Sequence, residues 1–373
     1  MTALEFPHSD VTSDDIRFME ATIRYARRHK GLTGTNPSVG TLIVKDGVIV
    51  GRGVTALGGR PHSEPQALAD AGEAARGATA YVTLEPCAHH GRTPPCAEAL
   101  VRAGVARVVV AATDPDDRVS GKGFAILREA GIEVEPGILA EKAADDLAGY
   151  LNRSSRKRPE VILKLALSAD GMIGKKGEGQ VPITGQVSRA QSHILRSQTD
   201  VILIGIETAL ADDPVLNCRL PGLEQRSPIR VVLDSGLRLP LASKLVQSAD
   251  AQPLWIACAD DASPERRYEL KAAGCRILAT EAHDCRIALP ELMDDLAAQG
   301  IGSVLVEGGA GVAKSFLEEK LVDRLITFRS PIEIGAADGV AVPGLETHIA
   351  EEFKILRQAR FGDDAYAEYV RKS

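Results

Sequence analysis

The segment TLEPCAHHGRTPPC, residues 83–96, places two cysteines at the ends of a loop that contains two histidines. Six cysteines in 373 residues is sparse use, which is typical of a reducing compartment, where paired thiols bind metals more often than they form disulfides. His62, in PHSEPQAL, is the candidate third ligand beside Cys87 and Cys96. One imidazole and two thiolates suit zinc, and three protein ligands leave its fourth position for water, which is typical of a catalytic site.

Glu64 follows His62 by two residues, and this spacing gives the carboxylate a role in the same site. Zinc lowers the pKa of its water to about 7, and a neighbouring carboxylate can take that proton and pass it to a leaving amine. In zinc-dependent nucleobase deaminases the glutamate of an H-x-E triplet acts as acid and base and does not bind the metal. The alternatives are a closed structural zinc site and a chance grouping of residues.

The elements around these residues are predicted to bring them together. A helix is expected from about Pro65 to Arg76, ATAYVTL (78–84) reads as a buried strand, and another helix is expected after Pro95. Helix starts carry partial positive charge, which stabilises thiolate over thiol. Asp46-Gly47, between TLIVK and VIVGRG, predicts a hairpin, and the later alternation of strands and helices predicts a parallel sheet covered on both faces.

The length of the chain predicts two domains, and the residue composition changes at Tyr150. YLNRSSRKRPE (150–160) is polar and basic and shows no apolar period, so it is interpreted as a solvated linker or a domain edge between domains 1–150 and 151–373. The alternative is that its Arg/Lys run contacts phosphate or nucleic acid. A second α/β series then begins with the strand VILKLALS.

VEGGAG (306–311) in this second series joins a strand to a helix through a glycine-rich turn. Such a turn can offer backbone N–H groups to a cofactor phosphate at a helix N-terminus. It does not match the G-x-G-x-x-G spacing of a Rossmann fold. A tight turn with no ligand is the alternative.

The overall charge and hydropathy exclude several classes of protein. A net charge of −7 argues against a general nucleic-acid or membrane-surface binder. No run of eighteen apolar residues predicts a transmembrane helix, and the start, MTALEFPHSD, shows no secretory signal pattern. We therefore expect a cytoplasmic protein without nucleic-acid or membrane partners.

HSE and TLEPCAHHGRTPPC together resemble the amino-terminal half of the bifunctional riboflavin-biosynthesis deaminase/reductase family. Deaminases of nucleosides and tRNA usually have P-C-x-x-C, whereas here eight residues separate Cys87 from Cys96. NPSVG (36–40) and GKGF (121–124) also fit, and the resemblance covers nearly the whole chain. It implies an α/β fold in which a cytidine-deaminase-like three-layer domain precedes a dihydrofolate-reductase-like domain.

The resemblance also implies a substrate, two cofactors and two reactions. Zinc-dependent hydrolysis would deaminate 2,5-diamino-6-(5-phosphoribosylamino)pyrimidin-4(3H)-one. NADPH would then reduce the ribose of 5-amino-6-(5-phosphoribosylamino)uracil to a ribityl chain. The partners expected are these small phosphoribosylaminopyrimidines and further copies of the chain in a homo-oligomer.

Site residues can be carried over where local motifs match the family. Beside the metal ligands His62, Cys87 and Cys96 and the catalytic Glu64, the resemblance places Lys164 near the reacting sugar. The expected cofactor contacts are Ala166, Thr208, Asp212, Gly308, Gly309 and Gly311. The expected substrate contacts are Asn36, His89, Arg196, Leu216, Arg219 and Glu307. His89 could instead be a spare polar group of its loop, and each arginine taken singly could be a surface ion pair.

This sequence departs from the family pattern at several positions. Pro65 and Gln66 stand within HSEPQAL, Asp116 replaces an asparagine expected near the ribose, and Pro182 replaces an aromatic residue expected on the cofactor. These changes bear on substrate contacts and cofactor affinity more than on reaction type. Two other functions stay open from the sequence: a tRNA or nucleobase deaminase whose second domain grips RNA, and a non-catalytic structural-zinc module.

Overall fold

The computed structural model describes residues 11–91, 94–116, 118–283 and 286–372. The amino-terminal decapeptide, in which no secretory signal was expected, and Arg92 and Thr93 of the GRTPPC motif lie outside the described residues. The chain divides into two compact units, Met1–Lys157 and Arg158–Ser373. No helix within the described ranges is long and apolar enough to cross a membrane.

The segment 150–160 holds the edge between the two units, at Lys157–Arg158, but the predicted solvated linker is wrong, because helix α5 (Ala140–Arg156) runs through most of the segment. Leu147 is buried, and Tyr150 and Leu151 pack against the same core, so the apolar face of the helix extends into the segment that reads as polar. Arg153 and Arg156 lie in the last turn of this helix, and Lys157 is its C-cap. Cations are favoured there because the carbonyl end of a helix carries partial negative charge.

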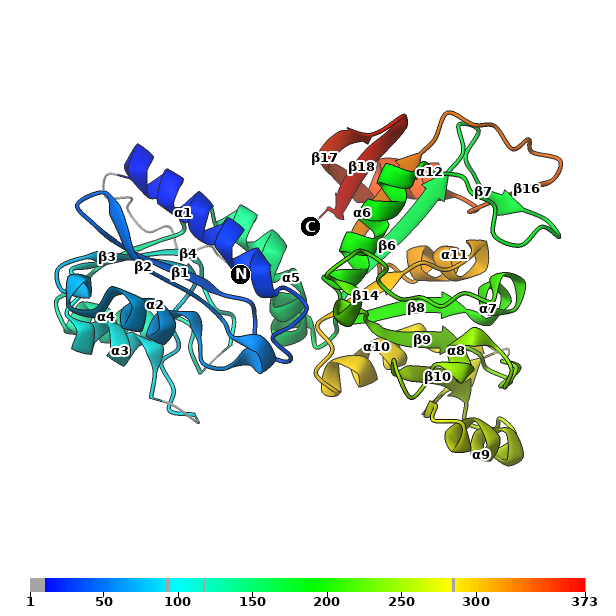
Figure 1. The fold of residues 1–373 in the computed structure, drawn as a ribbon, viewed down its shortest axis with the longest axis horizontal. Helices are drawn as coiled ribbons and strands as arrows, with labels where there is room; N and C mark the ends of the chain where they lie inside the picture. Colours follow the sequence, from blue (N-terminus) through cyan, green and yellow to red (C-terminus); the bar gives the residue numbers. More distant parts are fainter. Residues whose placement is uncertain (1–10, 92–93, 117, 284–285, 373) are drawn as a thin grey trace. The chain divides into compact units, whose positions relative to one another are not determined.

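The first unit is a three-layer α/β/α domain (Figure 1). Its five-stranded sheet has the order β2-β1-β3-β4-β5, with α1 and α5 on one face and α2, α3 and α4 on the other. The strands are β1 (Gly40–Lys45), β2 (Val48–Val54), β3 (Thr79–Leu84), β4 (Arg107–Ala112) and β5 (Glu133–Pro136). The remaining helices are α1 (Ser13–Ala26), α2 (Ser63–Ala71), α3 (Cys96–Ala103) and α4 (Lys122–Glu129).

Two features of this sheet follow from the sequence as predicted. Strands β1 and β2 form an antiparallel hairpin whose turn residues, Asp46 and Gly47, both have positive φ (49° and 76°). That conformation is the one that an Asp-Gly pair favours between two strands. Strands β3, β4 and β5 are parallel, and β3 and β4 are buried along nearly their whole length. The site residues that follow β3 are therefore held by a rigid strand.

The second unit is built on a nine-stranded sheet with the order β11-β10-β9-β8-β14-β6-β15-β18-β17 (Figure 1). All its strands are parallel except the β17–β18 hairpin, which pairs antiparallel with β15. The strands of this sheet are β6 (Glu160–Leu167), β8 (Val201–Gly205), β9 (Ile229–Leu233), β10 (Leu254–Ala259), β11 (Arg276–Thr280), β14 (Ser303–Val306), β15 (Arg324–Arg329), β17 (Phe353–Phe361) and β18 (Asp364–Arg371).

Helices and two small ribbons complete this unit. The helices are α6 (Gln186–Ser197), α7 (Ile206–Asp212), α8 (Lys244–Gln247), α9 (Pro264–Ala272), α10 (Leu289–Ala298), α11 (Ala310–Glu318) and α12 (Leu345–Glu352). The ribbons pair β7 (Met172–Lys175) with β16 (Gly339–Ala341), and β12 (Ala282–His283) with β13 (Arg286–Ile287). The parallel strands β6, β8 and β14 lie side by side, so their carboxyl ends share one edge.

A buried charge network ties β6, β15 and β18 together. Arg324 Nε donates to Glu160 Oε1 over 3.0 Å, and its Nη1 donates to Glu368 Oε1 over 2.5 Å. Only 9% of Arg324 and 2% of Glu160 is exposed. The two carboxylates hold the pKa of Arg324 above its usual range despite its burial. Removing the cation would leave two buried anions without their shared partner.

We therefore expect Arg324→Met to lower the unfolding free energy of the second unit by about 3–5 kcal/mol. Trp255 is the one tryptophan of the chain and lies in β10, so its fluorescence in urea reports on this unit alone. Arg329→Met is the matched control, because the Arg329–Glu346 pair on the same strand is exposed and is expected to contribute less than about 1 kcal/mol. Equal losses in the two variants would contradict the expectation.

Candidate active site

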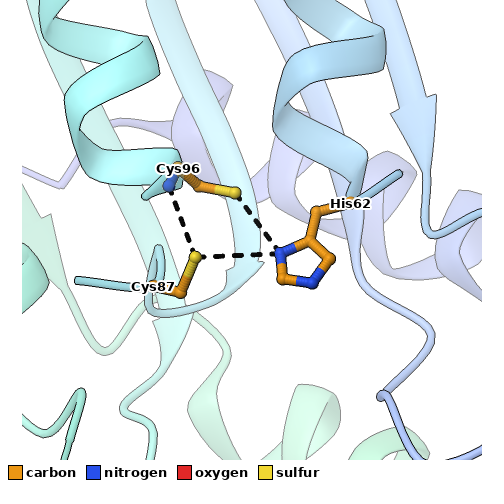
Figure 2. A group of neighbouring side chains, drawn as sticks. All are labelled: His62, Cys87 and Cys96. Carbon is orange, nitrogen blue, oxygen red and sulfur yellow. Dashed lines mark hydrogen bonds between the residues drawn. The ribbon is translucent and has the colours of Figure 1, made fainter. Parts of the chain in front are cut away.

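Three side chains of the first unit gather where the sequence predicted a metal site. His62 Nδ1 lies 3.8 Å from Cys87 Sγ and 3.4 Å from Cys96 Sγ. The ligand atoms of the three residues all lie within 4.8 Å of one another. Figure 2 shows the imidazole facing both sulfur atoms with one and the same nitrogen.

The helices α2 and α3 place two of these residues at their first turns. His62 is the N-cap of α2 and Cys96 is the first residue of α3. Cys87 lies in the loop that leaves β3, and the backbone N–H of Cys96 donates to its sulfur over 3.3 Å. The N–H groups and partial positive charge of a helix start stabilise a thiolate. The predicted arrangement of two helix starts beside one buried strand is thus what the structure has.

These residues fit a zinc ion in spacing and in chemistry. Zinc–nitrogen bonds of about 2.0–2.1 Å and zinc–sulfur bonds of about 2.3 Å give tetrahedral N···S edges of roughly 3.6 Å. The two observed N···S distances, 3.4 and 3.8 Å, lie on either side of that value. Three protein ligands of this kind are typical of catalytic zinc, whereas structural sites use four.

The two thiols are coupled through a hydrogen bond. The bond from Cys96 lowers the pKa of Cys87 to about 4. The same bond, together with burial, raises the pKa of Cys96 above its usual range. One negative charge is therefore shared by two sulfurs, and a divalent cation between them is what allows both to ionise.

Glu64 lies in the first turn of α2 and is buried beside this cluster. Ser63 Oγ donates to its Oε2 over 3.1 Å, and its carboxyl group also hydrogen-bonds the Cys96 thiol. Burial raises the pKa of Glu64. A carboxyl group in this position can hold a proton close to the fourth position of the metal, as its predicted role requires.

A cavity of about 690 Å³ opens onto this cluster, and we call it the zinc-site cavity. Asn36, His62, Glu64, Cys87 and His89 all line it. The Asn36 side-chain amide donates to Gly59 O over 2.9 Å, which orients this side chain at the wall. The structure thus brings Asn36 and His89, the two substrate contacts predicted in the first unit, to the same cavity as His62 and Cys87.

Glu85 braces the far wall of this cavity, a role that was not assigned from the sequence. Its buried carboxylate accepts backbone N–H groups from Asp114, Gly121 and Gly123 over 3.4, 3.2 and 3.1 Å. A Cβ on Gly123 would lie 2.1 Å from Pro86 O, so only glycine fits there. The signal was present in the sequence, because Glu85 stands two residues before Cys87 and Gly123 belongs to GKGF.

Asp116, which replaces the asparagine expected near the ribose, is neutralised locally by Arg118. The guanidinium donates from Nε to Oδ1 over 2.9 Å and from Nη2 to Oδ2 over 2.5 Å. This pairing lowers the pKa of Asp116 to about 2. The extra charge of the replacement is therefore matched by a cation two residues away, and both residues line the zinc-site cavity.

A second cavity, of about 1000 Å³, lies in the second unit at the carboxyl ends of β6, β8 and β14, and we call it the glycine-turn cavity. Eight predicted residues line it: Lys164, Ala166, Thr208, Asp212, Glu307, Gly308, Gly309 and Gly311. Gly309 is the N-cap of α11, and its N–H donates to Thr208 Oγ1 over 3.1 Å.

The glycine-turn cavity fits a dinucleotide phosphate at the start of α11. A Cβ on Gly308 would lie 2.8 Å from the Val312 side chain, so the turn packs tightly onto its helix. At Gly311 the space beside the backbone is open. A helix N-terminus with an open approach is a ready anion site. The predicted phosphate contact is therefore sterically available.

The substrate residues predicted in the second unit are distributed differently. The Arg196 guanidinium pairs with the Glu307 carboxylate, and its Nε and Nη2 each donate to a carboxylate oxygen over 2.9 Å. Its Nη1 donates to Asn217 O. Leu216 is buried and has a positive φ of 56°. Arg219 is exposed, and its backbone N–H donates to His193 Nδ1. The roles of these three residues in binding substrate stay predictions. The Arg196 guanidinium, which was expected to bind the substrate phosphate, is paired with Glu307 in this structure.

Comparison with known proteins identifies the family. Residues 12–112 match the cytidine and deoxycytidylate deaminase zinc-binding region, and residues 159–366 match the RibD C-terminal domain. The chain is 40% identical to the riboflavin biosynthesis protein RibD of Escherichia coli, over 95% of this chain and 99% of that protein. It is 37% identical to RibD of Aquifex aeolicus, over 96% and 98%. The chain belongs to the RibD family. The predicted resemblance is thus confirmed.

Solved RibD structures share the fold along nearly the whole chain. RibD of Acinetobacter baumannii superposes with a TM-score of 0.85 at 38% identity, covering 96% of this chain and 99% of that one. A deaminase/reductase from Thermotoga maritima superposes with a TM-score of 0.82 at 30% identity, with the same coverage. The predicted fold class is confirmed: a cytidine-deaminase-like domain followed by a RibD C-terminal reductase domain. Zinc and NADPH are the cofactors of these two RibD domains, as predicted.

Proposed function

We propose that this chain performs two steps of riboflavin biosynthesis, with a deaminase in residues 1–157 and a reductase in residues 158–373. The Thermotoga maritima relative is described as a diaminohydroxyphosphoribosylaminopyrimidine deaminase and 5-amino-6-(5-phosphoribosylamino)uracil reductase. The proposed substrates are the same two compounds. The observation that carries the proposal is the cluster of His62, Cys87 and Cys96, with Glu64 buried beside it at the zinc-site cavity.

In the first step His62, Cys87 and Cys96 would hold zinc. Zinc, when bound, supplies hydroxide at neutral pH, because it lowers the pKa of water to about 7. Glu64 accepts the proton of the attacking water at its carboxylate and delivers it to the exocyclic amine, which leaves as ammonia. Asn36 and His89, on the wall of the zinc-site cavity, orient the pyrimidine.

In the second step the turn at Gly308–Gly309 and the start of α11 would hold the phosphates of NADPH, which would supply hydride. Ala166, Thr208 and Asp212 line the rest of the cofactor site in the glycine-turn cavity. Lys164 lies at the wall of the same cavity with its ammonium group 5.7 Å from the centre of the Phe328 ring. We assign Lys164 to the proton needed at the sugar oxygen during reduction, and Glu307 to the charge balance around it.

Incubation of the purified chain with the diaminopyrimidine substrate, followed by mass spectrometry, tests both halves at once. Without NADPH the expected product has lost one amine as ammonia and gained one oxygen. With NADPH that product should gain two hydrogens in addition. An unchanged substrate mass in the zinc-loaded protein would refute the proposed deaminase, and an unreduced product in the presence of NADPH would refute the proposed reductase.

The setting of these activities is also part of the proposal. We infer a cytoplasmic enzyme that acts on small molecules and binds no nucleic acid, supported by the sparse cysteines and the net charge of −7. Membership of the RibD family does not favour the RNA-gripping or structural-zinc alternatives. A homo-oligomer stays a prediction, which light scattering of the purified protein measures.

A further inference from the structure

The basic run at the end of α5 reaches the zinc-site cavity. Arg153 and Lys157 line this cavity together with Tyr150 and Ser154, and Arg60 and Arg118 line it as well. The sequence alone favoured a solvated linker for this run and kept a phosphate contact as the alternative. Because this segment is the end of a helix, its basic side chains have defined positions at the cavity, where they could contact a phosphate.

The acidic groups of the cavity are already engaged by other partners. Glu64 lies beside the metal cluster, and Glu85 accepts three backbone N–H groups. Asp114 accepts the Tyr150 hydroxyl on both of its oxygens, at 3.0 Å each. Asp116 is paired with Arg118. None of these four carboxylates is paired with the cations at the end of α5, within the part of the chain that the structure describes.

The contacts of Arg153 and Lys157 are to backbone carbonyl groups instead. Arg153 Nη2 donates to Thr35 O, which fixes the guanidinium against the loop that carries Asn36. Lys157 Nζ donates to Ser154 O over 2.8 Å. Within the described residues, the partners of both side chains at the cavity wall are therefore neutral carbonyl groups and not carboxylates.

Two buried side-chain nitrogen atoms at the same wall lack a protein partner among the described residues. Arg153 Nε and His89 Nδ1 are both shielded from solvent and form no hydrogen bond to the described residues. A buried polar atom without a partner is uncommon in a native structure and calls for an explanation. A ligand with several acceptor oxygens in this cavity would provide one.

We propose that Arg153 and Lys157 form the phosphate-binding end of the zinc-site cavity and select for substrates with a 5-phosphate on the ribose. The inference rests on the proposed deaminase function and adds the residues that recognise its substrate. An arginine fork and an ammonium group match the geometry and charge of a phosphate monoester. The pyrimidine then lies at the metal end, and the ribose spans the wall that carries Asp116 and Arg118.

The size of the cavity favours a small molecule over a polynucleotide as the source of this phosphate. A volume of about 690 Å³ lies within the range of sites that enclose a single small ligand. Backbone binding to nucleic acid instead requires an extended basic surface, and the net charge of the chain is −7. Binding of tRNA that is lost in the α5 variants would overturn this choice.

The first test compares deamination of the phosphorylated substrate with that of its dephosphorylated counterpart. In Arg153→Ala/Lys157→Ala, the KM for the phosphorylated substrate should rise roughly 10–100-fold, because charge-assisted hydrogen bonds are lost. The KM for the dephosphorylated compound should stay the same, which a general loss of structure would not produce. Arg156→Ala is the matched control, since Arg156 lies on the same turn of α5 but not at the cavity. Equal effects on both substrates would overturn the proposal.

A second test does not depend on turnover. Cobalt loaded in place of zinc relaxes the ³¹P signal of a phosphate held in the same cavity, so ribose 5-phosphate serves as the probe. Enhanced relaxation is expected in the original chain and in Arg156→Ala, and its loss in Arg153→Ala/Lys157→Ala. Relaxation that is absent from the original chain, or equal in all three proteins, contradicts the phosphate assignment. Failure of the deaminase proposal shows separately, as an absence of ammonia release from either substrate.

Discussion

Glu64→Gln is expected to lower deaminase kcat by roughly 10²–10⁴-fold, the usual contribution of a positioned acid and base. The amide keeps the size and the hydrogen-bonding shape of the side chain but cannot take up the proton of the attacking water. Glu64 is buried beside the metal cluster, whereas Glu85 at the same cavity already accepts three backbone N–H groups, so Glu64 is the carboxylate placed to move this proton. Ammonia release, measured in steady state, gives the loss.

Zinc content and the second activity separate this effect from damage to the site. Glu64→Gln should retain one zinc per chain by elemental analysis, because the glutamate is not a ligand. Cys96→Ser is the matched control, since it removes a ligand and should lose both the metal and deamination. Reduction of the deaminated intermediate by NADPH should stay unchanged in both variants. Turnover that survives Glu64→Gln would show that another group carries the proton.

The zinc site could be predicted from the sequence because its ligands are set by residue type and by local elements. Cys87 follows a strand that reads as buried, and His62 and Cys96 stand where helices begin. Each of these signals lies within a few residues of the ligand. Given the directions of the strand and the two helices, all three ligands must lie on the same side of the sheet.

The end of α5 could not be predicted in the same way. The apolar positions of this helix become sparse after Leu151, and the residues beyond it are polar, so the pattern resembles a linker. What keeps the segment helical is packing of Leu147 and Tyr150 onto a core formed by distant strands. Long-range packing of this kind leaves no mark in the local sequence, and with it the link between Arg153 and the zinc-site cavity was also hidden.

Ion pairs between residues far apart in the sequence could not be predicted either. Arg196 and Glu307 are 111 positions apart, and their bidentate contact changes the role that an arginine at that place would otherwise suggest. The Arg196 and Lys164 charges hold the pKa of Glu307 at about 2, although burial alone would raise it. Glu307 raises the pKa of Lys164 while burial and Arg196 lower it, so Lys164 is sensitive to any change at Glu307.

Glu307→Gln should shift the alkaline limb of the reductase pH profile to lower pH. Burial lowers the pKa of Lys164, the Glu307 charge raises it, and the Arg196 charge lowers it. Removing the carboxylate leaves burial and Arg196, both of which favour the neutral amine. If the ammonium form is the one that acts, activity is lost as pH rises through the pKa of Lys164, and this loss then begins earlier. An unchanged limb in Glu307→Gln would contradict the assignment of that limb to Lys164.

Lys164→Met is expected to lower reductase kcat by roughly 10²–10⁴-fold, again the range for a positioned proton donor. Methionine fills a similar volume in this buried position, so the packing of β6 against β15 and Phe328 should persist. Stopped-flow measurement of NADPH oxidation gives the rate. The binding of NADPH should change little, because its phosphates are proposed to bind at the Gly308–Gly309 turn and not at Lys164.

Lys164→Arg provides the matched comparison, since it retains a charge but cannot release a proton at accessible pH. If Lys164 only balances the charge of Glu307, arginine should restore most of the rate that methionine removes. If Lys164 supplies the proton to the sugar, both variants should be slow, and only the original chain should show the alkaline limb. A wild-type rate in Lys164→Met would show that Lys164 takes no part in the reaction. The protonation of Lys164 beside Glu307 would then not determine the pH profile.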